Sequence, residues 1–70
     1  MEMISVSSSN LAAIGYDYDT ASLRIQFNRS GTYEYQGVPA EVYEGLLAAA
    51  SKGQFFDLHI KKVGYPFAKL

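Results

Sequence analysis

The sequence contains no cysteine, no tryptophan, a single histidine and only two prolines. Without cysteine the chain can form neither a disulfide nor a thiolate metal site, and its composition is compatible with a reducing compartment. Its apolar runs are far too short to cross a bilayer, which takes about 20 apolar residues. Residues 1–10 lack the basic start and the apolar block of an export signal. We therefore expect a cytoplasmic protein that does not contact a membrane.

The side chains that catalysis or metal binding requires are also scarce. His59 is the only histidine, and Asp57, two positions away, would point to another side of a helix. Asp17 and Asp19 share a loop, but no third ligand follows at the spacing of a calcium-binding loop. The glycines match neither of the common phosphate-binding patterns. We therefore predict that the protein is not an enzyme and has no cofactor, no bound metal and no small-molecule substrate.

What the sequence does contain is a succession of alternating apolar and polar residues. Residues 22–28 and 32–36 each have apolar side chains at every second position, which is typical of a half-buried strand. Residues 11–16 form a further strand pattern that precedes them. Aspartate and threonine at 17–20, and serine and glycine at 30–31, favour turns between these segments. Together the three segments predict an antiparallel β-meander.

The second turn predicts which residues face one another. A three-residue loop at 29–31, with glycine in its left-handed position, places Phe27 opposite Tyr33 and Ile25 opposite Tyr35. In this register the large apolar side chains of the meander gather on one face. We therefore interpret Tyr33 and Tyr35 as a core motif whose rings point inward, and not as an exposed platform on which bases stack.

The remainder of the chain predicts two helices. Pro39 suits the first turn of a helix, and apolar residues follow it at three- and four-residue spacing. Ser51 is the expected N-cap of a second helix, in which Phe56, Ile60 and Val63 share one face. Two amphipathic helices need an apolar surface, and the meander offers one.

The predicted fold is therefore α+β: a three-stranded antiparallel β-meander covered on one face by two C-terminal helices. A chain of 70 residues forms a single domain, residues 1–70. Within it, residues 1–8 form either a flexible arm or an edge strand. Residues 65–67 form a short extended tail whose rings dock on the body of the domain.

Basic residues gather toward the C-terminus, although the formal net charge of the chain is −1. Residues 51–70 carry four lysines against a single aspartate. Such a cluster is either a solvated helix surface or a contact face for a polyanion. The lysines, with one tyrosine ring as a stacking surface, form one candidate nucleic-acid face, and an arginine on the polar face of the sheet forms another. The candidate contact residues are Lys52, Lys61, Lys62, Tyr65, Lys69 and Arg24.

The ordered set of motifs also resembles a known family. The segments that carry the resemblance are Ser8/Ser9-Asn10 before the first strand, Tyr16-Asp17, Leu23 to Phe27, GTYEYQGVP at residues 31–39, ASKGQFF at residues 50–56 and Ile60-Lys61. This succession resembles the KTSC domain, named for its occurrence at the C-terminus of some lysyl-tRNA synthetases. The resemblance extends from about Ser7 to Tyr65, and Tyr33 and Tyr35 match the Tyr-x-Tyr motif of the family.

The resemblance implies a small bacterial or phage protein, and RNA binding has been suggested for the family. Together with the lysines of residues 51–70, it predicts a non-catalytic binding module whose partner is RNA. The alternative is a protein-interaction module. Such a module contacts another protein, as an adaptor does, or a second copy of itself through a sheet edge.

Overall fold

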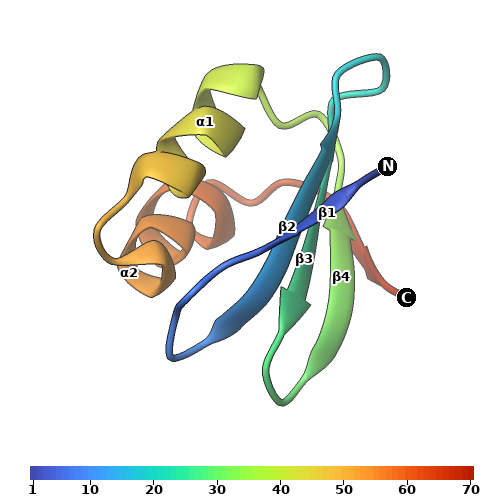
Figure 1. The fold of residues 1–70 in the computed structure, drawn as a ribbon. Helices are drawn as coiled ribbons and strands as arrows, with labels where there is room; N and C mark the ends of the chain where they lie inside the picture. Colours follow the sequence, from blue (N-terminus) through green and yellow to red (C-terminus); the bar gives the residue numbers. More distant parts are fainter.

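The computed structural model describes all 70 residues and consists of one sheet and one helical layer. Five antiparallel strands follow one another in chain order: β1 (Met3–Ser5), β2 (Leu11–Asp17), β3 (Ser22–Phe27), β4 (Gly31–Tyr35) and β5 (Phe67–Lys69). One face of this sheet is covered by α1 (Ala40–Ala48), α2 (Lys52–Phe56) and η1 (Asp57–Lys61), a π-helical turn that continues α2 (Figure 1). The fold class is therefore α+β, as the sequence predicts.

The sheet has five strands, so the prediction of three was wrong. β1 pairs with β2 at one edge, and β5 pairs with β4 at the other. β1 is the edge strand that the sequence left as one of two alternatives for residues 1–8. β5 escaped prediction because it is only three residues long and all of them are exposed, so that it has no apolar alternation. Both chain ends lie on the side of the sheet away from the helices (Figure 1).

The register between β3 and β4 differs by two residues from the predicted one. Ile25 lies opposite Tyr33 and not opposite Tyr35. Gly31 has a φ of 94° and already pairs with Phe27, so that the loop consists of the three residues before it. Because side chains alternate with a period of two, a shift of two residues leaves both tyrosines on the face that was predicted.

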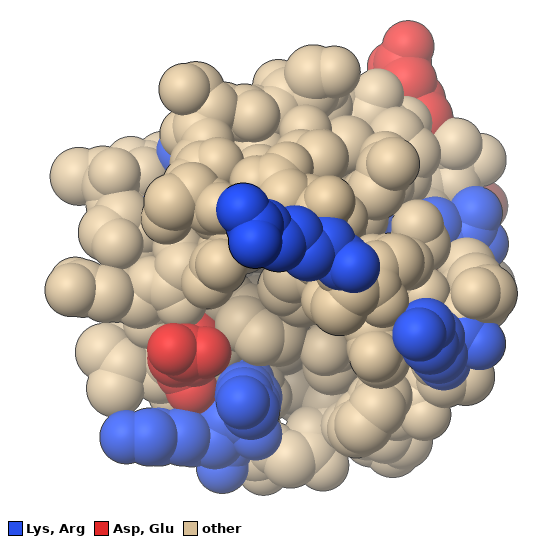
Figure 2. All heavy atoms as spheres, turned by 90° about the horizontal axis from the view of Figure 1, so that it is seen from below, with Lys and Arg blue, Asp and Glu red and all other residues tan.

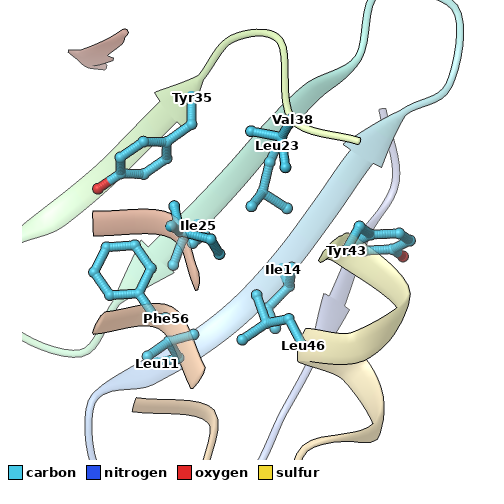
Figure 3. Packing of buried hydrophobic residues seen from close by; sticks show 10 residues of the cluster. Leu11, Ile14, Leu23, Ile25, Tyr35, Val38, Tyr43, Leu46 and Phe56 are labelled. Carbon is cyan, nitrogen blue, oxygen red and sulfur yellow. The ribbon is translucent and has the colours of Figure 1, made fainter. Parts of the chain in front are cut away.

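The core lies between this face of the sheet and the helices. Ile14, Ile25 and Leu46 are fully buried at its centre (Figure 3). In β2 the pairing is irregular between Leu11 and Ala13, as at a β-bulge. The bulge brings Leu11 and Ile14, three positions apart, into the same core, which strict alternation would not allow. Tyr35 is buried in this core, whereas Tyr33 is half-buried and packs against it.

Both helices begin where the sequence predicts. The carbonyl of Pro39 accepts a hydrogen bond from the Val42 amide at 3.0 Å, which starts the first turn of α1. The hydroxyl of Ser51 accepts one from the Gln54 amide at 3.4 Å, as an N-cap does. The N-cap satisfies an amide that would otherwise have no partner within the helix.

The second helix departs from the prediction after α2. In η1 the Lys62 amide donates to the Asp57 carbonyl at 3.1 Å, the i to i+5 spacing of a π-helix. The wider turn rotates later side chains away from the face that a regular helix would give them. Phe56 and Ile60 are buried as expected, but Val63 is 58% exposed. The prediction that Val63 shares their buried face was therefore wrong.

The different burial of the two tyrosines predicts different costs of truncation. Tyr35→Ala should lower the free energy of unfolding by about 3 to 5 kcal/mol, because it removes the ring of a core residue that is only 7% exposed. Tyr33→Ala should cost roughly half of that, because the partly exposed ring leaves a smaller cavity. Urea denaturation followed by circular dichroism measures both variants. An equal loss, or a larger loss for Tyr33→Ala, would contradict the assignment.

Candidate functional site

A cavity of about 510 Å³ opens at the end of the sheet where the β3–β4 turn lies. It is bounded by β3, β4 and β5 on the sheet side and by α2, η1 and the segment after them on the helical side. Ligand pockets in proteins commonly measure about 300 to 1,000 Å³ and combine apolar walls with a few polar groups. Six aromatic side chains line this one: Phe27, Tyr33, Tyr35, Phe56, Tyr65 and Phe67.

Five of these rings form a closed circle of contacts. Phe27 lies edge-on to Phe56, with ring centroids 5.2 Å apart, and to Tyr33 at 5.6 Å. Phe67 contacts Tyr33 at 5.9 Å and Tyr35 at 5.3 Å. The contact between Tyr35 and Phe56, at 5.6 Å, completes the circle. The rings come from β3, β4, α2 and β5, so the aromatic wall depends on the whole fold.

The hydroxyl of Tyr35 adds a polar group to this wall. Tyr35 is 7% exposed, yet its hydroxyl forms none of the side-chain hydrogen bonds, and no fully buried polar side-chain atom lacks a partner. The hydroxyl must therefore reach solvent, and the residue lines the cavity beside Phe56 (Figure 3). Burial, and secondarily the nearby Tyr33, raises the pKa of Tyr35. The group thus stays protonated at neutral pH and can donate a hydrogen bond into the cavity.

The mouth of the cavity is basic. Arg29 in the β3–β4 turn and Lys61 at the end of η1 line it, and Asp57 is the only acidic residue in its wall. The ammonium group of Lys69 lies 5.9 Å from the centroid of the Tyr33 ring, within the range of a cation–π contact. Figure 2 looks onto this end of the molecule, where Lys and Arg side chains are spread around a hollow and acidic side chains are fewer.

The opposite end of the sheet is acidic and also aromatic. Tyr16 and Tyr43 stack with ring centroids 4.9 Å apart, and the ring of Tyr18 meets Tyr16 edge-on at 4.8 Å. Burial is the main cause that raises the pKa of Tyr16, and the charges of Tyr18, Glu41 and neighbouring carboxylates raise it further. A chain with a formal net charge of −1 is thus divided into a basic end at the cavity and an acidic end at the β2–β3 turn.

The structure brings together four of the six predicted contact residues. Lys61 and Tyr65 line the cavity, and Lys69 lies beside it over the ring of Tyr33. Lys62 follows Lys61 and lines a shallow depression next to it. Together with Arg29, these four residues make up the basic end of the domain.

The other two predicted contact residues lie elsewhere. Arg24 projects from the opposite face of the sheet, where its guanidinium donates to a carboxylate oxygen of Glu34 at 2.6 and 3.0 Å. Lys52 lies at the start of α2, and its ammonium group donates to the Ala49 carbonyl at 2.9 Å. Both cations already have partners within the chain, whereas Arg29, Lys61 and Lys62 form no side-chain hydrogen bond or ion pair within it.

Sequence reasoning missed Arg29, Phe67 and Asn10 as members of a site. Arg29 lies in the turn that follows β3, two residues after Phe27, the last inward-pointing residue of that strand. This proximity to an inward-pointing ring was the sequence signal that could have placed Arg29 at the site. Phe67 was predicted only as part of a docking tail, and its pairing with Tyr35 depends on a contact between distant segments. Asn10 lies in the β1–β2 connection, and the sequence marks it only as part of one segment of the family resemblance and not as a contact residue.

No three His, Cys, Asp or Glu side chains come together in the structure in the way that a metal ion requires. His59 packs against Phe55, with ring centroids 4.3 Å apart. None of the helices has the length and the apolar character that a membrane crossing demands.

The fold defines the chain as a small single-domain α+β protein, and comparison with known proteins identifies its family. The model of the KTSC domain matches residues 7–65, and the chain belongs to the KTSC domain family. The crystal structure of a KTSC domain protein from Yersinia pestis superimposes with a TM-score of 0.95 at 43% sequence identity. That match covers 99% of this chain and 96% of the other.

Two further relatives are similar over most or all of this chain. An uncharacterized protein of Stutzerimonas stutzeri (strain A1501) is 33% identical over 70 residues, which is 100% of this chain and 99% of the relative. A lysine–tRNA ligase of Nostoc punctiforme is 37% identical over 59 residues, which is 84% of this chain but only 10% of the ligase. The family description names a domain and no reaction.

The ion pair on the outer face predicts a pH dependence of stability. The hydrogen bond from Arg24 holds the pKa of the Glu34 carboxyl below its ordinary value. The pair should therefore stabilise the fold above the pKa of an unfolded glutamate, about 4.3. This contribution is lost as the pH falls through the lower pKa of the folded state.

Glu34→Gln should flatten the decline of stability with acid, as measured by urea denaturation across the acidic range. Glu2→Gln is the matched control, because it removes the same charge from an exposed residue outside the ion pair. If Glu34→Gln and the unmodified chain lose stability in parallel as the pH falls, the ion pair does not contribute.

Proposed function

We propose that this KTSC domain is a non-catalytic module that binds single-stranded RNA through its basic end. The observation that carries the proposal is the coincidence of unpaired cations and partly exposed aromatic rings at one end of an otherwise slightly acidic chain. Proteins that bind single strands combine positive side chains along the phosphate backbone with aromatic rings for the bases. They recognise RNA mainly where its bases are unstacked and accessible.

The relatives support RNA as the kind of nucleic acid. A region of the Nostoc punctiforme lysine–tRNA ligase, an enzyme that is named for a tRNA substrate, is similar to this chain over 59 residues. A domain that accompanies such an enzyme is well placed to contact RNA. For the present chain, which spans only 10% of the ligase, this similarity supports RNA contact and not the ligase reaction.

The separation of charge supports a defined orientation of the strand. Phosphates are attracted to Arg29, Lys61 and Lys62 and are repelled by the carboxylates around Tyr16 at the other end. A strand would therefore approach the β3–β4 turn and η1, and not the β2–β3 turn. Such local fields steer association even where the net charge is small.

The alternative function is a protein-interaction module, and the edges of the sheet favour it. β1 and β5 are short edge strands, each with one side unpaired, and Ile4 and Phe67 on them are exposed. Open strand edges can pair with another chain, including a second copy of the same protein. An alternative of this kind depends on backbone pairing and predicts little dependence on salt.

The affinity for RNA should fall steeply with salt. If three cations neutralise phosphates, the logarithm of the affinity should decrease with the logarithm of the salt concentration with a slope of about −2, since each contact to a single strand contributes about −0.7. Fluorescence anisotropy of a labelled single strand of about 12 nucleotides measures this slope. Binding that ignores salt would favour the protein-interaction alternative instead.

Substitution identifies the cations that take part. Lys61→Gln combined with Lys62→Gln should weaken binding and make the slope shallower, because two phosphate contacts are lost. Arg24→Gln combined with Lys52→Gln is the matched control: it removes the same charge from side chains that are held by Glu34 and Ala49. Equal losses in the two double variants would show that binding responds only to net charge, and the proposed surface would be wrong.

A further inference from the structure

We propose that the aromatic cavity receives one unstacked base of the bound strand, while Arg29 and Lys61 hold the phosphate of the same nucleotide at the mouth. The involvement of a strand rests on the proposed function. The preference of the cavity for an aromatic ring that carries a phosphate rests on the cavity itself.

The walls of the cavity suit a flat ring. Its volume of about 510 Å³ is that of a site for a small ligand. Six aromatic side chains line it, and aromatic rings pair favourably in offset-stacked and edge-to-face arrangements. Phe67 is 62% exposed although it contacts Tyr33 and Tyr35, so part of its ring is left free for a ligand.

Two polar groups are placed to meet the edge of a base. Asn10 lines the cavity, is exposed, and its side-chain amide forms none of the hydrogen bonds within the chain. An amide both donates and accepts, as the hydrogen-bonding edge of a base requires. The hydroxyl of Tyr35 is a second donor. By contrast, the amide of Asn28 is occupied, because its nitrogen donates to the Ser8 and Ser9 carbonyls at 3.2 and 3.0 Å.

The charges at the mouth select an anion. Arg29 and Lys61 both line the cavity, one in the β3–β4 turn and the other in η1, and Asp57 supplies the single carboxylate among the lining residues. A purely apolar ligand would leave both cations unused, and a cationic ligand would be repelled by them. A nucleotide joins a flat ring to a phosphate within one molecule and matches both parts of the site.

The test compares two exposed aromatic residues at opposite ends of the domain. Phe67→Ala removes a ring that is 62% exposed, and Tyr18→Ala removes one that is 63% exposed at the acidic end, so neither variant should unfold the domain. Phe67→Ala should weaken binding of the RNA strand between about 5-fold and 150-fold, the range for loss of one stacked base. Tyr18→Ala should leave binding unchanged.

Small probes test the cavity independently of the strand. Adenosine 5′-monophosphate should bind, as followed by ligand-detected NMR titration, and ribose 5-phosphate, which has the phosphate but no base, should bind at least about 5-fold more weakly. Phe67→Ala should remove this difference between the two probes.

The outcomes separate this inference from the proposed function. If the strand binds with the expected salt dependence but Phe67→Ala and Tyr18→Ala behave alike, the cavity does not hold a base, and the proposed function stands. If the strand does not bind but adenosine 5′-monophosphate does, with the expected loss in Phe67→Ala, RNA is the wrong partner and the cavity still recognises a nucleotide. If the two small probes bind equally, or neither binds, the inference about the cavity is overturned.

Discussion

The strict alternation of β3 and β4 is the constraint on which the rest of the structure depends. It places Ile25, Phe27, Tyr33 and Tyr35 on one face of the sheet. The helical layer that must cover this face is short, since α2 and η1 have five residues each. It covers the centre, where Ile25 is fully buried, but it leaves the aromatic end of the strands only partly enclosed. The cavity is therefore a consequence of how the core is built: it is the end of the core that the helices do not close.

The sequence predicted those parts of the structure that depend on residues close to one another along the chain. The faces of β3 and β4, the N-cap at Ser51 and the α+β class all follow from local patterns. The register error of two residues did not change any face, because the period of a strand is two. β5 and η1 could not be predicted, since β5 depends on docking against β4 and η1 depends on a change from regular helical to π-helical hydrogen bonding that no local pattern announces. The site was found only in part for the same reason, because Phe67 and Arg29 join it through contacts between distant segments.

Net charge was a poor guide to the surface of this domain. A formal net charge of −1 argues against a polyanion as partner, yet the fold collects its unpaired cations at one end. It does so because the β3–β4 turn, η1 and β5 all meet there, and each supplies a basic side chain. Carboxylates gather at the other end, around the stacked rings of Tyr16 and Tyr43. In a domain of this size the charge at one end of the sheet can therefore differ in sign from the net charge of the chain.

RNA is proposed to meet this domain at the end of the sheet where the core is left open. The most direct measurement is the change in backbone amide NMR shifts when an unlabelled single-stranded RNA is added to the isotope-labelled protein. The largest changes are predicted to fall in the β3–β4 turn, in η1 and in β5, with little change around Tyr16 and Tyr43. Changes that concentrate at the β2–β3 turn, or on the outer face around Arg24 and Glu34, would contradict the proposal.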